Sequence, residues 1–437
     1  MNRRTALAST AGLAAAACSG RDERTIRFWA MGREGEVAPA LLAGFERENP
    51  GVRLRIEQLP WTAAHEKLLT AVAGDATPDI AQMGNTWLPE MAALGALEPL
   101  QPWLNMSPAI QSADYFEGIW RTNSVAGMDG VARVVGLPWY VDTRLLFVRR
   151  DLLLKAGVAD MPETWADWLK ACAALQAIGV ETPLFLPPPP EFEPLLALAL
   201  QQDDELLKEQ GTRGNFSGPG FRRALNFYLQ LFQRGFAPGL SGNTVANIWQ
   251  EIGRGTFAFY ISGPWNIGEF KRRLPAELQD AWATAPLPGP TGLGASVAGG
   301  ASLVMFKRST VKPLVWKLIE YLARPAVQQQ FYRLTGNLPP RRSTWKIPTG
   351  GPMEGPQDHT ATLADDPHAR AFFEQLTRVR ATPGVPEWER IAQEMQLAAS
   401  RAAHAGVDVE TTVRMLDQRV DQILEKRRWM LTSKAAR

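Results

Sequence analysis

Aromatic, amide and charged side chains gather where the expected strands of this chain end. In "GDATPDIAQMGNTW" a short apolar run, Ile80 to Met83, leads directly into Gly84, Asn85 and Trp87. The run is too short for a helix and is typical of a buried strand. Open α/β sheets bind ligands in the crevice outside the carboxyl ends of their strands. We therefore expect Asn85 and Trp87 to lie beside such a crevice.

The same residue types recur along the chain and suit one kind of ligand. A sugar ring has apolar C–H faces and a rim of hydroxyls, so an indole can cover a face while amides, carboxylates and guanidinium groups bind the rim. The alternative is that several of the tryptophans are core residues, and that the charged residues near the start are solvated on a turn. The candidates are Trp29, Arg33, Glu34, Asn85, Trp87, Trp139, Tyr140, Asp142, Arg144, Trp265 and Asn266.

The sequence does not support a metal site, a nucleotide-binding site or a serine hydrolase. The four histidines have no partners at metal-ligand spacing and no Cys/His cluster exists, so we expect neither a metal nor a cofactor. There is no P-loop, and Val297 stands where a dinucleotide-binding motif needs its third glycine. Ser296 resembles a nucleophile elbow, but it precedes the expected strand instead of following it. We assign no catalytic residue.

The first residues predict export. Residues 1–17 have a basic start and a small, apolar stretch, as in a signal peptide, and Cys18 directly follows Ala15, Ala16 and Ala17. This pattern resembles a bacterial lipobox with Cys18 as the lipidated first residue, followed by a polar tether over 18–24. Removal of two arginines from 47 basic residues leaves 45 against 45 acidic ones, so no nucleic-acid surface is expected. Cys172 lies in a helical pattern and is expected to be a buried, unreactive thiol.

Strands and helices alternate along the chain. Alternation predicts strands at 25–30 and 52–59, and a 3.6-residue period predicts helices around 37–45 and 62–73, with a turn at Gly32–Gly35. Strand, helix, strand, helix, strand is typical of a largely parallel, doubly wound sheet. Farther on we expect strands at 145–148 and 301–306, and another within 257–265 that ends on a loop with an indole. We also expect a helix that starts near Asp151, helices at 164–178 and 220–234, a helix around 312–334 that breaks at Pro325, and a helical tail.

The order of these pieces resembles a known family. "FERENPGVRLRIEQLPW", "AGDATPDIAQMGNTWLPEMAALGALEPL", "GLPWYVDTRLLFVRRDLLLKAGV", "PETWADWLKACAAL" and "GTFAFYISGPW" are similar to stretches of the extracellular solute-binding proteins of bacterial ABC sugar importers, the family with maltose- and trehalose-binding proteins. So is "PLPGPTGLGASVAGGASLVMFKRSTVKPLVWKLIEYLARPAVQQQFYRLTGNLPPRRSTW". Together they cover about residues 25–345 in the family's order.

The resemblance implies an α/β periplasmic-binding-protein fold of two lobes, each a mainly parallel sheet flanked by helices, with hinge crossovers. The first lobe would hold 25–138 with 296–336, and the second 139–295 with 337–437. It also implies a monomer that is exported to the periplasm or cell surface, is held to the membrane only by the lipid on Cys18, and delivers a small saccharide to ABC permease subunits.

The resemblance also assigns roles to individual residues. It implies that Asn85 and Trp87 belong to the first-lobe wall, that Trp265 stacks on sugar from the second lobe, and that the chain recrosses at two glycines. With the candidates above, the implied ligand-binding residues are Trp29, Arg33, Glu34, Asn85, Trp87, Tyr140, Asp142, Arg144, Trp265, Gly299, Gly300 and Arg341. The tetraproline Pro187–Pro190 departs from the family, because the family usually carries a less rigid loop there.

We expect a non-enzymatic sugar receptor, with trehalose or maltose favoured on resemblance alone. A secreted glycoside hydrolase remains an alternative, which would need two carboxylates about 5 to 9.5 Å apart across a cleft. A carrier of peptides or polyamines is another alternative, and it would favour acidic or strongly charged cleft loops over indoles.

Overall fold

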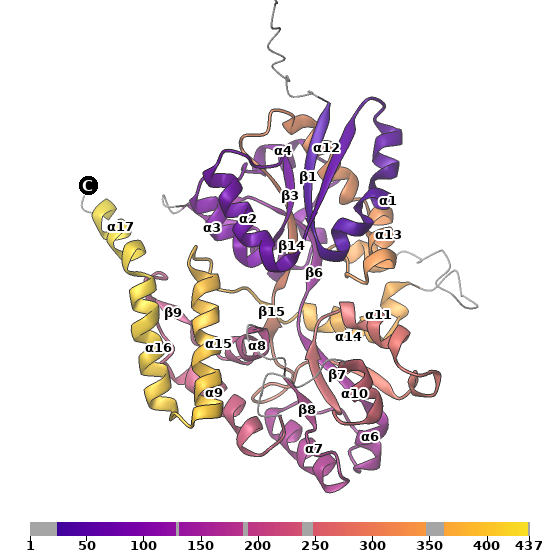
Figure 1. Cartoon of the computed structure of the whole chain (residues 1–437), viewed down its shortest axis with the longest axis vertical. Helices are drawn as coiled ribbons and strands as arrows, with labels where there is room; N and C mark the ends of the chain where they lie inside the picture. The colour runs from indigo at the N-terminus through magenta and orange to yellow at the C-terminus, as the bar shows by residue number, and fades with distance from the viewer. Residues whose placement is uncertain (1–23, 128–130, 187–190, 238–247, 347–361, 436–437) are drawn as a thin grey trace, which may run out of the picture.

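The computed structural model describes residues 24–127, 131–186, 191–237, 248–346 and 362–435. The expected signal peptide, Cys18, most of the tether and the tetraproline segment lie outside these ranges. Figure 1 shows two lobes, one above the other, with the C-terminal helices beside the lower one.

The first lobe is built on a five-stranded sheet in the order β2-β1-β3-β14-β6. Strand β1 pairs in parallel with β2 and β3, whereas β14 runs antiparallel to both β3 and β6. The bounds are β1 Thr25–Met31, β2 Arg53–Leu59, β3 Ile80–Gly84, β6 Leu137–Asp142 and β14 Gly299–Met305.

The second lobe is built on a four-stranded sheet in the order β12-β7-β11-β8. Only the β11–β8 pair in it is parallel. Its bounds are β7 Leu145–Arg149, β8 Leu184–Phe185, β11 Phe259–Ser262 and β12 Trp282–Ala285. The small pairs are β4 Ser124–Ala126 with β5 Ala132–Val134, β9 Leu207–Lys208 with β10 Arg213–Gly214, and β13 Ser296–Val297 with β15 Val379–Arg380.

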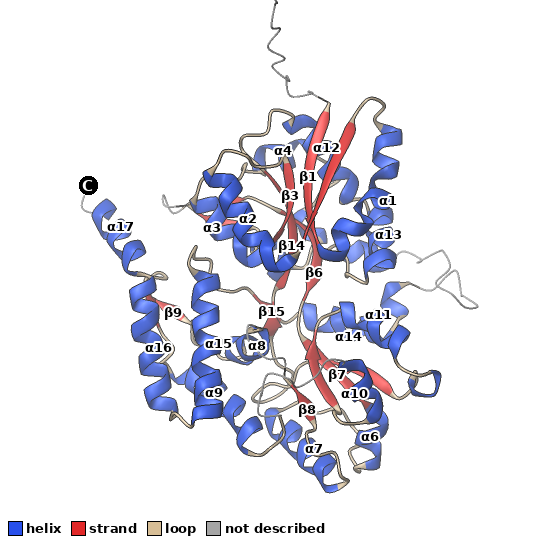
Figure 2. Cartoon of the chain, in the orientation of Figure 1, coloured by secondary structure: helices blue, strands red, loops and turns tan. Residues whose placement is uncertain are grey.

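Helices flank both sheets, as Figure 2 shows. Those of the first lobe are α1 Gly32–Glu48, α2 Trp61–Ala73, α3 Leu88–Ala93, α4 Gln101–Met106, α5 Glu117–Arg121, α12 Lys312–Leu322 and α13 Pro325–Thr335. Those of the second are α6 Arg150–Lys155, α7 Trp165–Ala177, α8 Glu193–Leu200, α9 Pro219–Gln233, α10 Ile248–Arg254, α11 Trp265–Arg273, α14 Pro367–Leu376, α15 Trp388–Ala405, α16 Val409–Ile423 and α17 Glu425–Ala435.

The two-lobed α/β fold is confirmed, but the expectation of mainly parallel sheets is wrong in detail because both sheets are mixed. The cause is the path of the chain. It leaves the first sheet at Asp142 and enters the second at Leu145, then returns at Gly299, so β14 enters the first sheet from the side where β1 and β3 end. Residues 139–142 pair in the first sheet, within β6. The lobe boundaries otherwise remain a prediction.

The expected helices and strands mostly match the observed ones, with two corrections. Gly32–Gly35 is not a turn but the first turn of α1, because Gly32 adopts a left-handed φ of 49° that joins β1 directly to the helix. Trp265 is the first residue of α11 and not a loop residue. The predicted break at Pro325 is confirmed, since α12 ends at Leu322 and α13 begins at that proline.

Each lobe has its own hydrophobic core. Phe28, Leu41 and Phe45 pack in the first, and Trp168 and Phe259 in the second. The tail packs on the second lobe, because Trp388 of α15 belongs to the same core as Trp168. Within the described ranges, we find no helix that is both long and apolar enough to span a bilayer.

Candidate functional site

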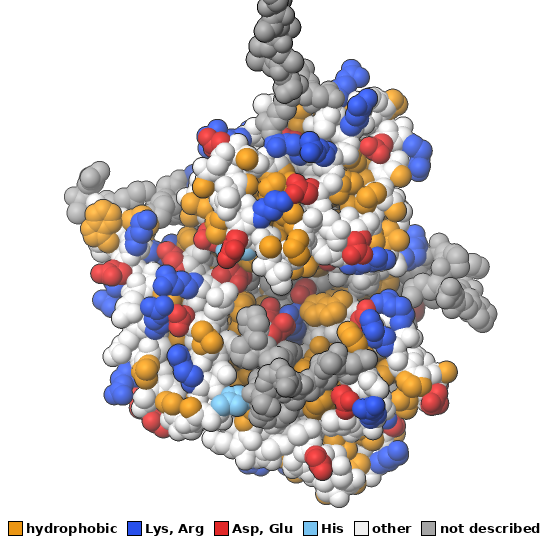
Figure 3. Space-filling model, viewed as in Figure 1, with side chains coloured by type: hydrophobic (Ala, Val, Ile, Leu, Met, Phe, Trp, Pro, Cys, Tyr) orange, Lys and Arg blue, Asp and Glu red, His pale blue; other side chains and the backbone are white. Residues whose placement is uncertain are grey.

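A cavity of about 660 Å³ lies between the two lobes, at the carboxyl end of β3. This volume is typical of a site for a small molecule. Figure 3 shows acidic, basic and hydrophobic side chains close together in the hollow across the middle of the molecule. The lining residues are Arg33, Glu34, Trp61, Gly84, Asn85, Thr86, Trp87, Tyr140, Asp142, Thr143, Arg144, Glu191, Phe192, Glu193, Leu196, Trp265, Val297, Gly299, Gly300, Asn337 and Glu389. We call this cavity the cleft.

One part of the first-lobe wall is a buried hydrogen-bond network around Glu34. Its Oε1 accepts a bond of 2.6 Å from Asn337 Nδ2. Burial raises the pKa of Glu34, although hydrogen bonds from Asn337 and Tyr140 oppose that effect. The Tyr140 hydroxyl also accepts from Gln82 Nε2 at 3.2 Å. These bonds fix Glu34 and Tyr140 before any ligand arrives.

The other part of that wall follows β3. Asn85 is buried, and its Oδ1 accepts a bond of 2.8 Å from Ser302 Oγ of the neighbouring strand β14. Its Nδ2 is buried and has no hydrogen-bond partner. Trp87 packs edge-on against Trp61, with ring centroids 5.6 Å apart. Asn85 therefore presents an unsatisfied donor beside two indoles.

The floor of the cleft holds one arginine among three carboxylates. Arg144 is 6% exposed, and its guanidinium lies 2.6 Å from Asp142, 2.8 Å from Glu191 and 3.3 Å from Glu193. Burial raises the pKa of Asp142 and raises that of Glu193 to about 7, while Arg144 opposes both shifts. Nearby, Thr143 Oγ1 is buried without a hydrogen-bond partner.

Trp265 forms the aromatic surface of the second-lobe wall. It is 36% exposed, and its ring lies 4.9 Å from the Arg144 guanidinium, which is cation–π geometry. A Cβ added at Gly263 would lie 2.0 Å from the Trp265 ring, so only glycine allows this position of the indole. The "SGPW" turn thus determines where the ring lies.

Glu389 reaches the cleft from α15 and was missed by sequence reasoning. Thr86 Oγ1, on the first lobe, donates a hydrogen bond to Glu389 Oε1. Burial raises the pKa of Glu389, although the hydrogen bond from Thr86 opposes that shift.

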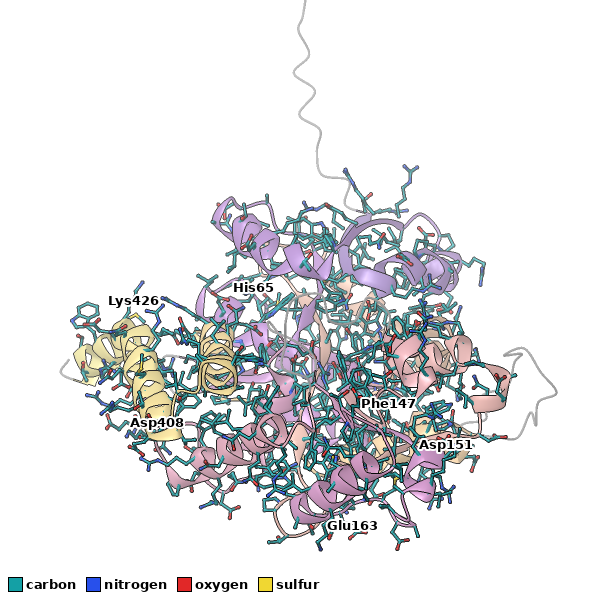
Figure 4. The ribbon with its side chains drawn as sticks, turned by 60° about the horizontal axis from the view of Figure 1, so that its bottom comes forward. His65, Phe147, Asp151, Glu163, Asp408 and Lys426 are labelled. Carbon is teal, nitrogen blue, oxygen red and sulfur yellow. The ribbon has the colours of Figure 1, made fainter. Side chains whose placement is uncertain are left out.

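A histidine on the first-lobe side is paired with a carboxylate. His65 Nε2 lies 2.7 Å from Glu90 Oε2, and this bond raises the pKa of His65. Figure 4 labels His65, which belongs to α2 and lies on the side of the first lobe toward the C-terminal helices.

Not every residue expected in the site lines the cleft. Trp29 lies in β1 under Lys67, whose Nζ is 4.8 Å from its ring. Arg341 instead binds Asp114 at 2.7 Å and the Ala323 carbonyl. The expected positions of Trp29 and Arg341 are therefore corrected: each side chain contacts a partner outside the cleft lining, Lys67 and Asp114 respectively. The other expected ligand-binding residues, Arg33, Glu34, Asn85, Trp87, Tyr140, Asp142, Arg144, Trp265, Gly299 and Gly300, all line the cleft.

Two further candidates are internal. Trp139 is 2% exposed and stacks on Phe331 with centroids 4.4 Å apart. Asn266 is buried between Trp249 and Ser262, to which it is hydrogen-bonded. Both have structural roles. For Trp139 this is the core alternative stated for the tryptophans, whereas for Asn266 the hydrogen bonds to Trp249 and Ser262 correct the expected role.

The lining residues that were not predicted differ in how strongly their local sequence indicates them. Glu191 and Glu193 directly follow the proline run, in "PEFEP", and that context could have indicated them. Thr86 and Thr143 each lie between two predicted site residues, and that context could have indicated them as well. Trp61, Asn337 and Glu389 were not indicated by the local sequence, and packing brings them to the cleft. Gly300, in contrast, is explained locally: its φ is 123°, and a Cβ there would lie 2.3 Å from the Tyr140 carbonyl oxygen.

The arrangement favours binding over reaction. Two buried polar atoms, Asn85 Nδ2 and Thr143 Oγ1, lack partners although buried polar groups are normally hydrogen-bonded. Both belong to residues that line the cleft, beside a partly exposed indole. A ligand with hydroxyls and a flat apolar face would satisfy both features.

Comparison with known proteins places the chain among solute receptors. Residues 31–329 match the family model of the bacterial extracellular solute-binding proteins. The sugar-binding protein MalE of Xanthomonas citri is 52% identical, with a TM-score of 0.86, and the match covers 93% of this chain and 99% of that one. A binding protein of Brucella abortus is 28% identical, with 88% of each chain covered. The diacetylchitobiose-binding protein DasA of Streptomyces coelicolor is 22% identical, with 86% of this chain and 84% of DasA covered.

Proposed function

Because the chain belongs to the bacterial extracellular solute-binding protein family, we propose that it captures a small saccharide in the cleft and delivers it to the permease of an ABC-type importer. Membership of this family makes it a solute-binding protein and not a glycoside hydrolase. The observation that carries the proposal is the cleft itself: an indole beside unsatisfied buried polar atoms, between two lobes.

Capture would work by closure of the two lobes. Asn85 and Trp87 come from the first lobe, and Arg144 and Trp265 from the second, so one ligand can contact both walls. A ligand that contacts both walls binds the closed arrangement better and shifts the population toward it. The permease would then recognise the closed form.

A disaccharide is the ligand that we favour, with trehalose or maltose first. The cleft volume of about 660 Å³ suits a molecule of that size. The similarity to a sugar-binding MalE at 52% identity supports a saccharide but does not distinguish one disaccharide from another.

The protein would act outside the cytoplasm as a monomer on a lipid anchor. The family's members are extracellular, and the "AAAC" sequence at Ala15–Cys18 supports lipidation of the cysteine. The anchor would precede the tether and leave the cleft accessible.

A saccharide panel tests the proposal. A ligand present at 100 times its Kd should stabilise the native state by about 2.7 kcal/mol, which thermal melting detects. We expect a shift with trehalose or maltose, followed by 1:1 binding in calorimetry. A panel of neutral mono-, di- and trisaccharides that produces no shift would refute the proposal.

The charges of the cleft favour one second candidate, a carrier of cationic solutes such as polyamines. Carboxylates outnumber guanidinium groups among its lining residues, which suits an ammonium group. Spermidine in the same panel distinguishes the two, because a polyamine carrier should bind spermidine more tightly than any neutral saccharide, whereas a saccharide receptor should bind a saccharide best.

A further inference from the structure

The charged side chains that line the cleft are unbalanced in sign. Five carboxylates and two guanidinium groups line it: Glu34, Asp142, Glu191, Glu193 and Glu389 against Arg33 and Arg144. Arg33 compensates little, because its side chain is 62% exposed and pairs at 2.8 Å with Glu36. Arg144 is therefore the main cation inside the described part of the cleft.

The three carboxylates around Arg144 exceed its charge. Together with the single guanidinium, Asp142, Glu191 and Glu193 carry two uncompensated negative charges when all are ionised. Burial chiefly, and Glu191 in addition, raises the pKa of Glu193 to about 7, against the attraction of Arg144. With all four groups ionised the net charge of the cluster is therefore −2, and protonation of Glu193 alone leaves it at −1.

The same groups determine which hydrogen bonds a ligand can make. An ionised carboxylate has about four lone-pair positions and no donor. Arg144 occupies some of these positions, and the remainder need donors from the ligand. Hydroxyl and ammonium groups can donate, but a ligand carboxylate or phosphate offers mainly acceptors and adds like charge.

We propose that the cleft selects its ligand by charge: it accepts neutral or cationic solutes and rejects anionic saccharides such as uronic acids and sugar phosphates, with Glu191 and Glu193 as the specificity-determining residues. The inference rests on the proposed function only in that the ligand binds in this cleft. Glu191 and Glu193 determine it because their side chains are 36% and 26% exposed and are within reach of a ligand. Glu34, in contrast, is buried and already accepts a bond from Asn337.

The test compares matched pairs of ligands that differ by one phosphate. Calorimetry measures Kd for trehalose and trehalose 6-phosphate, and for maltose and maltose 6′-phosphate. We expect each phosphate to bind at least about 100-fold more weakly than its parent, a difference of about 2.7 kcal/mol. The ratio of the two Kd values within each pair should decrease as the salt concentration rises, because ions screen the repulsion between solvent-exposed charges. Equal affinities within a pair would overturn the inference.

Variants separate charge from steric exclusion. In the double variant Glu191→Gln, Glu193→Gln the side-chain volumes are nearly unchanged, and the amide oxygens can still accept bonds from Arg144. We expect the affinity ratio within each pair to fall at least about tenfold. Glu277→Gln, an exposed change on η3 Ala276–Leu278, should leave the ratio unchanged. An undiminished ratio in a double variant with normal apo melting would show exclusion by shape and overturn the inference.

Failure of the proposed function can be distinguished from failure of the charge selection by which probes bind. We would measure thermal melting with spermidine, glucosamine and glucuronate beside the neutral saccharides. If no neutral saccharide binds but a cation does, the saccharide proposal falls and the charge selection stands. If glucuronate or a sugar phosphate binds best, or if no probe in the panel binds, the charge selection falls.

Discussion

Truncation of the cleft indole, Trp265→Ala, should weaken saccharide binding much more than it weakens the fold. The free protein leaves 36% of this residue exposed, on the side of the cleft. A tryptophan offers about 250 Å², so the exposed fraction corresponds to about 90 Å². At about 25 cal/mol per Å², covering that surface with a sugar ring contributes about 2 kcal/mol. The expected loss of affinity is therefore about 30-fold to 50-fold.

The assay is calorimetric Kd together with apo melting on the same variants. Trp265→Phe should lose less affinity, because part of the flat surface remains. Gly263→Ala should mimic the truncation, since its new Cβ would lie 2.0 Å from the ring and displace it. Trp429→Ala is the matched control, because that tryptophan is 67% exposed on α17, outside the cleft lining.

The apo stability of Trp265→Ala tests the alternative that this indole is a core residue. A fully buried tryptophan costs about 3 to 5 kcal/mol of stability when truncated, and we expect a smaller loss for Trp265. Unchanged affinity in a strongly destabilised Trp265→Ala protein would show that the indole is a core residue and remove it from the proposed site.

Three further predictions concern the anchor, the first-lobe wall and pH. Cys18→Ser should give a soluble protein with unchanged Kd, and a wild-type membrane fraction without lipid mass on Cys18 would refute the lipobox. Asn85→Ala should weaken binding about 10-fold to 100-fold by loss of a buried hydrogen-bond donor, and a drop in apo melting alone would assign it only the bond to Ser302. Burial lowers the pKa of His368, stacked on Trp282, to about 4. Since the unfolded chain then binds more protons, stability should fall between about pH 6.5 and 4, and denaturant unfolding of His368→Gln should lack that part of the loss.

Local pattern was enough to predict much of the fold. The apolar run before Gly84 gave β3, the alternation from Thr25 gave β1, and Pro325 gave the break between α12 and α13. These features depend on side-chain periodicity and on the geometry of proline, which act over a few residues. Local pattern also indicated Asn85 and Trp265 as candidates, because Asn85 directly follows β3 and Trp265 follows β11 after the turn residues Gly263 and Pro264.

The sequence alone could not show which strands run antiparallel. β14 lies between β3 and β6 because the chain returns from the second lobe, and the residues of β14 themselves do not indicate in which direction the strand pairs. Nor could it exclude Trp29 or Arg341, since the residues that hold them, Lys67 and Asp114, are distant in sequence.

The sequence by itself therefore determined the elements, the family and the indole and amide side chains at strand ends, because neighbouring residues dictate those features. The tertiary structure decided which further charges join Glu34, Asp142 and Arg144 in the cleft. Glu389 accepts a hydrogen bond from Thr86, which is 303 positions away in the sequence. Arg144 forms ion pairs with Asp142, Glu191 and Glu193. Electrostatic interactions depend on distance in space, and for residues far apart in the sequence the tertiary packing sets that distance.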